Sequence, residues 1–236
     1  MVMDEQDLTL YRRQLHDDLL SSEDQQVLKR QRVFILGLGG LGSPLALYLT
    51  AAGVGTLVLC DHDVVELSNL NRQVIHSRSR LGMAKTESAV RTLTELNPDV
   101  SCIPIRDVIA SSEDICRAAR QCSVLVDCTD NIAARVLLSR ASGELGIPLV
   151  HGGIYAWSGQ VSVFMPGEDP SLEDLLPEAD LPGMKPVIGA AAGVIGSIQA
   201  SEVIKLLLGK PSDLRTHMLV YDGLAGNVYR YMKART

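Results

Sequence analysis

Short apolar runs alternate with segments of helical spacing through most of this chain. The runs at 33–36 and 56–60 have the length of buried strands, and the segment 43–52 between them has helical periodicity. The alternation continues through predicted strands at 100–104, 123–127 and 148–151 and predicted helices at 84–96, 112–120 and 131–145. Strands that alternate with helices favour a mainly parallel sheet with helices on both faces, so the pattern predicts a doubly wound α/β fold.

The pattern changes at both ends of the chain. Before the first strand, 11–20 and 23–30 have amphipathic helical spacing, and Ser22 with Gln25 predicts a capping box for the second helix. The acidic, proline-containing stretch 166–186 is expected to cross the molecule as a loop. No linker divides the 236 residues, so we expect a single domain. The remaining predicted elements are antiparallel strands at 153–156, 160–164, 218–221 and 228–232, and a helix at 189–208.

Charge and cysteine content exclude several classes of protein. The net charge is −6 and no segment collects the 22 basic residues, which argues against a nucleic-acid partner. The apolar stretches are shorter than the roughly 20 residues of a membrane helix, and the acidic start lacks the apolar core of a secretory signal. The five cysteines form no Cys-x-x-Cys pair. We expect a cytoplasmic protein without membrane contact, with reduced thiols and no structural zinc.

A glycine motif follows the first predicted strand. Gly37-Leu-Gly-Gly-Leu-Gly42 opens the helix at 43–52, where backbone N–H groups at a helix N-terminus suit a phosphate or a ribose. Asp61 ends the next strand, nineteen positions after Gly42, where a carboxylate can accept both ribose hydroxyls. The alternative is that the glycines only allow close packing of strand and helix. Together, the motif and Asp61 predict a nucleotide site in a Rossmann-like fold.

Two basic residues bear on which nucleotide binds. Arg72 lies in the segment Asp63–Gln73, and Lys85 opens the following helix. A guanidinium fork and a point charge suit the triphosphate of ATP better than the pyrophosphate of NAD. Solvated surface cations are the alternative interpretation, and a dehydrogenase remains a rival function. The sequence contains no P-loop motif, so ATP binding of the P-loop type is excluded.

An acidic motif, Asp127-Cys-Thr-Asp-Asn131, ends the predicted strand at 123–127. It lies at the carboxyl edge of the sheet, where open α/β sheets bind their ligands. Asp130 is therefore a candidate Mg²⁺ ligand. It is also placed to cap the N-terminus of the next helix, and the two roles are compatible.

These motifs together resemble the ThiF/MoeB/HesA family of ubiquitin-activating-like adenylyltransferases. The likeness covers nearly the whole chain. It includes Tyr11-Arg-Arg-Gln14, the glycine motif, Ala52-Gly-Val-Gly55, Asp61, Leu67–Gln73, Lys85, Leu96-Asn-Pro98, Asp127–Asn131 and the helix from Gly193 to Lys205.

The resemblance implies adenylation of a carboxylate by MgATP in a homodimer. The favoured substrate is the C-terminal glycine of a ubiquitin-like sulfur-carrier protein with a Gly-Gly tail, of the thiamine or molybdopterin biosynthesis type. Asp130 would place Mg²⁺, and Arg13 would reach into the neighbouring subunit's site. The residues expected to bind the nucleotide are Gly37, Gly39, Gly40, Gly42, Asp61, Asp63, Ser68, Asn69, Arg72, Gln73, Lys85, Thr129, Asp130 and Asn131, and those expected to act in catalysis are Arg13, Arg72, Lys85 and Asp130.

The sequence departs from the family at its thiol positions. Members typically bind zinc through two Cys-x-x-Cys pairs, one in the crossing loop and one near the C-terminus, and this sequence has neither. The reactive cysteine of some relatives would fall at Pro182. We therefore expect a variant without zinc or a thiol intermediate. In this reading 1–30 is a helical N-terminal appendage, 31–152 the nucleotide-binding half, and 153–236 the substrate-binding half with the crossing loop 166–186.

Two alternatives to the favoured function remain open. The same chemistry with a peptide or a small-molecule carboxylate is one, and a non-catalytic scaffold subunit of this fold is the other. Among single residues, His62 and His76 are expected to be solvated loop histidines. His151 is expected either to line the substrate channel or to be a hydrogen-bonded interior histidine. Trp157 is expected at the tip of an antiparallel strand pair.

Overall fold

One eight-stranded sheet organises the chain, in the order β3-β2-β1-β4-β5-β6-β7-β8. The computed structural model describes residues 3–168, 170–180, 183 and 185–233. The first five strands in this order pair in parallel, and the last three are added in antiparallel register. The predicted α/β fold class is confirmed. The strands are β1 (Arg32–Leu36), β2 (Thr56–Cys60), β3 (Ser101–Ile105), β4 (Val124–Asp127), β5 (Leu149–Tyr155), β6 (Ser158–Phe164), β7 (His217–Asp222) and β8 (Asn227–Met232).

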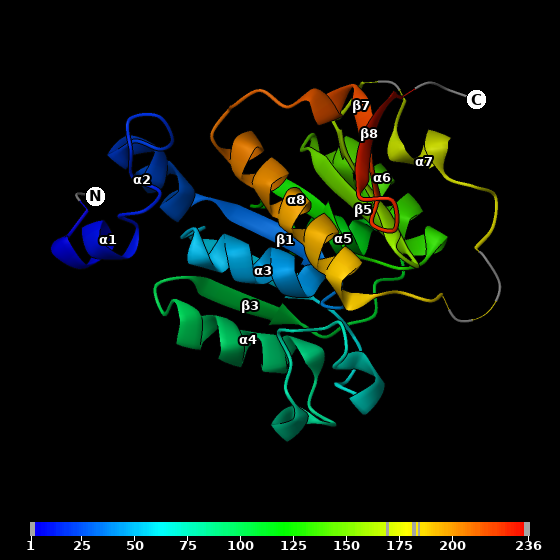
Figure 1. The fold of residues 1–236 in the computed structure, drawn as a ribbon, viewed down its shortest axis with the longest axis horizontal. Coiled ribbons are helices and arrows are strands. Elements are labelled where there is room, and N and C mark those ends of the chain that lie inside the picture. Colours follow the sequence, from blue (N-terminus) through cyan, green and yellow to red (C-terminus); the bar gives the residue numbers. More distant parts are fainter. Residues whose placement is uncertain (1–2, 169, 181–182, 184, 234–236) are drawn as a thin grey trace.

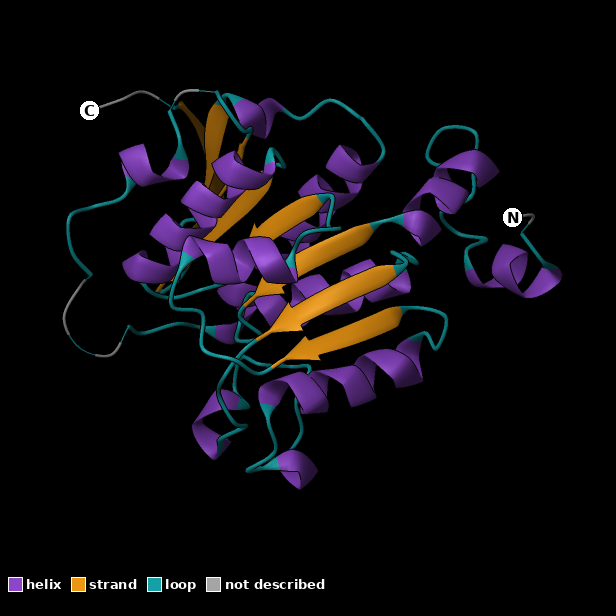
Figure 2. Ribbon diagram, turned by 180° about the vertical axis from the view of Figure 1, so that it is seen from behind, coloured by secondary structure: helices purple, strands orange, loops and turns teal. Residues whose placement is uncertain are grey.

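Helices cover both faces of the sheet (Figures 1 and 2). One apolar cluster packs α3, α4 and α8 on one face, and a second packs α5 and α6 on the other. The central strand β4 is buried along its whole length, as expected for a parallel strand covered on both sides. The helices are α1 (Glu5–Leu10), α2 (Ser22–Arg30), α3 (Gly42–Ala51), α4 (Lys85–Leu96), α5 (Ser112–Ala118), α6 (Ile132–Leu145), α7 (Leu172–Leu175) and α8 (Gly189–Leu207), with short 3-10 turns at Leu67–Asn69, Arg78–Arg80 and Asp213–Arg215.

The N-terminal appendage differs from the prediction. Residues 11–20 form turns and isolated bridges, and the first helix is α1, capped by Asp4. The apolar spacing of 11–20 reflects burial of single side chains: Tyr11 is almost fully buried and accepts a hydrogen bond from Asn97 Nδ2 at 2.9 Å. The predicted helix at 11–20 was therefore wrong, because tertiary contacts hold this segment in turns.

The helix α2 is confirmed, but its capping box lies one residue earlier than predicted. Ser21 accepts the Asp24 N–H, and the Asp24 carboxylate accepts the Ser21 N–H, each at 3.1 Å. Gln25, the predicted box partner, is buried and donates to the Ala52 carbonyl oxygen at 2.9 Å. Its role is to attach the appendage to the end of α3.

The strand β5 is continuous where the sequence predicted two strands. It starts in parallel beside β4 and continues as the antiparallel partner of β6. The glycines that suggested a break are needed for packing, because a Cβ at Gly152 would lie 2.5 Å from the Gln199 side chain of α8. Within the predicted crossing loop 166–186, residues 172–175 form the short helix α7.

The helix α8 packs against α3 through a glycine. A Cβ at Gly196 would lie 2.5 Å from the Leu41 carbonyl oxygen and 2.6 Å from Pro44 Cγ, whereas a Cβ at Gly193 would meet no atom within 4 Å. By length and composition, α8 alone among the helices of the described residues is apolar enough to cross a membrane, and 50% of its apolar 18-residue window is buried inside the protein.

These two glycines provide a matched test of helix packing. We expect Gly196→Ala to lower the free energy of unfolding by about 1–3 kcal/mol, because the methyl group overpacks the α3–α8 contact. Gly193→Ala should raise it by about 0.5–1 kcal/mol, because alanine loses less backbone entropy in a helix. Urea denaturation measures both changes, and equal effects of the two variants would contradict the close approach of α3 and α8.

Candidate nucleotide site

A cavity of about 740 Å³ opens at the carboxyl ends of the parallel strands and continues along the β5–β6 hairpin. It lies where the strand order reverses between β1 and β4, which is the usual ligand position in open α/β sheets. Most of the residues predicted for the nucleotide meet at this cavity. Its wall includes Gly37, Gly39, Gly40, Asp61, Asp63, Arg72, Gln73, Lys85, Thr129, Asp130 and Asn131.

The glycine motif combines both of its predicted roles. Gly37 has a φ of +96°, and a Cβ there would lie 2.6 Å from the Cys128 carbonyl oxygen. A Cβ at Gly42 would lie 2.1 Å from the Gly37 carbonyl oxygen, so Gly42 closes the turn and does not line the cavity. Gly39 and Gly40 do line it. The outer glycines thus allow close packing and the inner ones leave the wall open to a ligand.

An acidic pair holds the Lys85 ammonium at the cavity. Lys85 is buried, and its Nζ lies 2.8 Å from Asp63 Oδ2 and 4.0 Å from Asp61 Oδ2. Asp61 also accepts the Leu38 N–H at 2.7 Å. Burial acts to raise the pKa of Asp63, but the hydrogen bond and positive charge of Lys85 outweigh it, so this pKa lies below its ordinary value. Lys85 is therefore a fixed cation and not a solvated surface lysine.

The loop after β2 brings Arg72 and Gln73 to the cavity. The Arg72 guanidinium donates to the Ser68 carbonyl oxygen at 2.9 Å, and Asn69 Oδ1 accepts the Glu66 N–H at 3.0 Å. Ser68 and Asn69 do not line the cavity, so they shape this loop. Gln73 is 4% exposed, and its Oε1 has no hydrogen-bond partner among the described residues. A buried acceptor without a partner is costly.

In the acidic motif after β4, Asp130 and Asn131 have different roles. Asn131 is the N-cap of α6, because its Oδ1 accepts the Ala134 N–H at 2.9 Å. The Asp130 carboxylate, which is exposed at the cavity, makes one weak contact, to Asn131 Nδ2 at 3.5 Å. The capping role considered for Asp130 thus belongs to Asn131. Asp130 keeps its oxygens available for a ligand.

The crossing loop contributes charges that the sequence motifs did not indicate. Asp180 Oδ2 accepts the Ile132 N–H at the start of α6 at 2.9 Å, and Lys185 lies 2.8 Å from Asp180 Oδ1. Lys185 also donates to the Asp130 carbonyl oxygen. On α6, Arg135 donates to the Thr129 carbonyl oxygen at 3.1 Å. No motif or periodicity in the sequence indicates a role for these side chains, because the crossing loop reaches the N-terminus of α6 only in the folded chain.

The two loop histidines have different environments. His62 is exposed at the cavity rim, 3.4 Å from Asp63, as predicted. His76 is buried: its ring nitrogens contact Ser88 Oγ at 2.9 Å and the Leu38 carbonyl oxygen at 3.1 Å. The prediction of a solvated His76 was wrong, because this ring ties the loop after β2 to the glycine motif.

Burial lowers the pKa of His76 to about 4 from an ordinary value of 6.5. Because the unfolded chain then binds a proton more readily, the free energy of unfolding should fall by about 2–3 kcal/mol as the pH drops from 6.5 to 4, and this contribution should level off below pH 4. His76→Gln should flatten that part of the stability–pH curve, and the exposed His16→Gln should leave it unchanged. An unaltered slope in His76→Gln would contradict a neutral buried imidazole.

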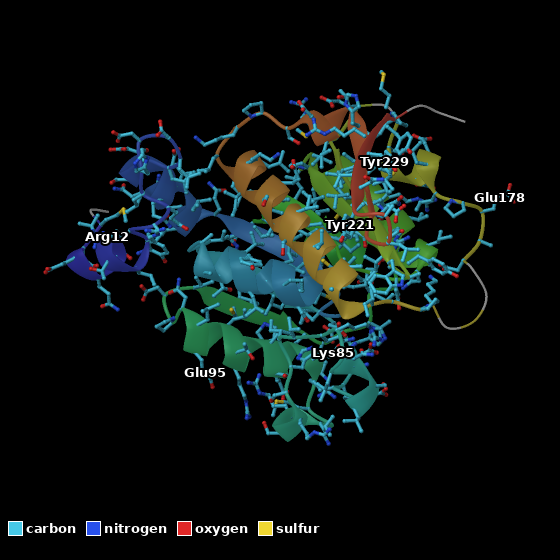
Figure 3. All side chains as sticks on the ribbon, viewed as in Figure 1. Arg12, Lys85, Glu95, Glu178, Tyr221 and Tyr229 are labelled. Atoms are coloured by element: carbon cyan, nitrogen blue, oxygen red, sulfur yellow. The ribbon has the colours of Figure 1, made fainter. Side chains whose placement is uncertain are left out.

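Other predicted residues lie away from the cavity. Arg13 does not line it; its neighbour Arg12 lies in the N-terminal appendage, well separated from the cavity residue Lys85 (Figure 3). His151 is fully buried, which confirms the interior alternative. Trp157 lies at the β5–β6 turn and is half exposed. Pro182, the position matched to the reactive cysteine, lies outside the described residues.

Comparisons with known proteins agree with this geometry. The ThiF family model matches residues 11–236. The SAMP-activating enzyme E1 of Haloferax volcanii is 41% identical over 228 residues, covering 94% of this chain and 84% of the relative. The adenylyltransferase and sulfurtransferase MOCS3 of Drosophila yakuba is 40% identical over 236 residues, covering 98% of this chain; the chain spans about half of that protein, 52% of its length.

Solved structures show the same fold at lower sequence identity. A crystal structure of PaaA has a TM-score of 0.83 and 20% identity, covering 98% of this chain and 75% of that one. E. coli MccB with MccA-N7isoASN has a TM-score of 0.82 and 22% identity, covering 92% of this chain and 69% of that one. The family match over nearly the whole chain, the identity to its relatives and the cavity at the predicted motifs lead to one conclusion: the chain belongs to the ThiF family of E1-like adenylyltransferases.

Proposed function

We propose that this chain uses ATP to adenylate the C-terminal glycine of a small ubiquitin-like sulfur-carrier protein and releases pyrophosphate. The observation that carries the proposal is one cavity at which a buried lysine, an arginine and an exposed carboxylate converge, namely Lys85, Arg72 and Asp130. Relatives that activate SAMP or are named adenylyltransferases support this chemistry. The proposal includes a cytoplasmic homodimer in which Arg13 reaches the neighbouring subunit's cavity, and a role of the thiamine or molybdopterin biosynthesis type.

The cavity offers a separate position for each part of ATP. We place the ribose at Asp61 and the adenosine against Gly39 and Gly40, which line the cavity. The phosphates would lie between Arg72 and Lys85. The fixed ammonium of Lys85 and the guanidinium of Arg72 suit an anionic ligand better than the apolar face of a nicotinamide.

The reaction joins two anions, and the cations of the site make that possible. A substrate carboxylate oxygen attacks the α-phosphorus, an acyl–phosphate bond forms, the bond to the bridging oxygen breaks, and pyrophosphate leaves with the electron pair. No proton is transferred, because the carboxylate is already ionised at neutral pH. Lys85 and Arg72 reduce the repulsion and hold the partners in line for displacement.

A magnesium ion fits the donor set at the end of β4. Asp130 presents a carboxylate, the hard oxygen ligand that Mg²⁺ prefers, and among the described residues its oxygens make only the 3.5 Å contact to Asn131. When bound, Mg²⁺ would neutralise phosphate charge and favour departure of pyrophosphate.

A peptide or small-molecule carboxylate is the second candidate substrate. Two of the solved structures that share this fold are of E. coli MccB with MccA, which is why this alternative is kept, and the likeness concerns the fold alone. A scaffold without catalysis is disfavoured because a scaffold does not require a buried cation beside an open carboxylate.

Exchange of labelled pyrophosphate into ATP tests the proposal. We expect exchange that depends on a carrier protein ending in Gly-Gly and is absent when that tail is removed. Exchange with small acids or short peptides alone would favour the second candidate. If no acceptor supports exchange and calorimetry detects no ATP binding, a non-catalytic scaffold is the remaining function.

A further inference from the structure

A buried polar chain links three neighbouring strands and ends at the cavity wall. Asp127 on β4 and His151 on β5 are both fully buried, and His151 Nδ1 lies 2.6 Å from Asp127 Oδ2. His151 Nε2 lies 3.2 Å from Nε2 of Gln160 on β6. Gln160 lines the cavity, whereas His151 and Asp127 do not. The nucleotide chemistry proposed above uses none of these three side chains.

Hydrogen bonds to Asp127 determine which group donates and which accepts along this row of side chains. Burial acts to raise the pKa of Asp127, but hydrogen bonds from His151 and Thr129 and the positive charge of Arg135 outweigh it, so this pKa lies below its ordinary value. Thr129 donates its N–H at 2.9 Å and its hydroxyl at 2.7 Å to Asp127 Oδ1. The ionised carboxylate therefore accepts the hydrogen on His151 Nδ1.

The histidine in turn orients the glutamine amide. The amide nitrogen of Gln160 can only donate, so His151 Nε2, 3.2 Å away, is its acceptor in this arrangement, while Nδ1 donates to Asp127. The amide nitrogen of Gln160 is thus turned to the interior. Its Oε1 is left as the acceptor for the cavity.

Two glycines of the β5–β6 hairpin lie close to Gln160 in the cavity wall. Gly153 is the cross-strand partner of Gln160, and a Cβ there would lie 3.3 Å from Gln160 Cγ. A Cβ at Gly159 would lie 2.4 Å from Ile195 Cγ1. Both glycines line the cavity on the β5–β6 hairpin, away from Asp61 after β2 and from Lys85 at the start of α4. At these two positions the hairpin presents main chain and no side chain to a ligand.

We propose that Gln160 Oε1 accepts the main-chain N–H of the C-terminal residue of the acyl substrate, and that Asp127 and His151 are positioning residues that hold the amide in this orientation. The inference rests on the proposed function and narrows its substrate to carboxylates that end a peptide chain. A simple carboxylic acid offers no N–H, so it would leave Gln160 unpaired.

The test compares two substrates that differ in one N–H group. One is a Gly-Gly-ending carrier protein; the other carries glycolate in place of the terminal glycine, so that an ester replaces the last amide and the carboxylate is kept. In the wild-type protein we expect the ester to raise the KM in pyrophosphate exchange by about tenfold. In Gln160→Met, the KM for the amide carrier should rise by a similar factor. The KM for the ester carrier in this variant should exceed that for the amide carrier by no more than twofold. The KM for ATP should stay within twofold throughout.

The positioning role of His151 has its own readout. In His151→Asn, the shorter amide can still donate to Asp127 but has no atom at Nε2, so Gln160 loses its anchor. We expect the ratio of ester to amide KM to fall from about tenfold to about twofold or threefold. A purely structural role would reduce the amount of active protein equally for both substrates and leave the ratio unchanged, which would overturn the positioning role.

Controls separate the possible failures. Gln121→Met, at an exposed glutamine outside the cavity, should behave as wild type. Wild-type exchange with equal KM for amide and ester carriers would overturn the inference and leave the proposed function standing. Absence of exchange with any peptide-ending acceptor would overturn both.

Discussion

Asp130→Ala should reduce carrier-dependent pyrophosphate exchange by about 10²–10³-fold, the scale of losing one group that stabilises transition-state charge. The Asp130 carboxylate is exposed at the cavity and makes one weak contact to Asn131, so its removal takes away a ligand position and little packing. The helix α6 keeps its cap, since Asn131 supplies it. We therefore expect an unchanged urea midpoint together with the loss of exchange.

The matched control for Asp130→Ala is Glu95→Ala. Glu95 is an exposed carboxylate on α4, outside the cavity (Figure 3). This variant should keep wild-type exchange, which separates a local effect from a change in net charge. A wild-type exchange rate in Asp130→Ala would contradict the proposed magnesium role.

Lys85→Met should lower exchange by about 10²–10³-fold and also reduce stability. The ammonium is buried between two carboxylates, so its removal leaves Asp61 and Asp63 without their cation and costs about 2 kcal/mol, the scale of a hydrogen bond to a charged group. Because the pKa of Asp63 lies below its ordinary value, its contribution to stability is present above that ordinary value and is lost as the pH falls through the lowered pKa. Lys85→Met removes the group that lowers this pKa, so the difference in free energy of unfolding between wild type and variant should shrink as the pH falls through the lowered pKa of Asp63.

Lys210→Met provides the control for this prediction. Lys210 is exposed, lies 3.5 Å from Asp24 and does not line the cavity. We expect Lys210→Met to change neither the exchange rate nor the pH dependence of stability. If Lys85→Met kept the wild-type exchange rate, Lys85 would be a structural cation and not a phosphate ligand.

Burial explains why the strands were predictable from sequence. The predicted strand at 56–60 coincides with β2, and the predicted strand at 33–36 lies within one residue of β1. Strands covered on both faces need continuous apolar runs, and those runs are visible without knowledge of the fold. The same reasoning gave a wrong prediction for 11–20, because Tyr11 is buried through contact with the distant Asn97 and not as part of the apolar face of a helix.

The sequence by itself determined the α/β class and the nucleotide edge of the site, because parallel strands bring the residues that follow them to one edge, as with Asp61 and Asp130. Only the tertiary structure decided that His76 is buried, that Asn131 caps α6, and that Lys185 approaches the end of that helix. The same holds for the link from Asp127 through His151 to Gln160, which joins three strands. Periodicity and motif spacing report each element's own environment, whereas these contacts depend on strand register and loop path, which arise when elements distant in sequence pack together.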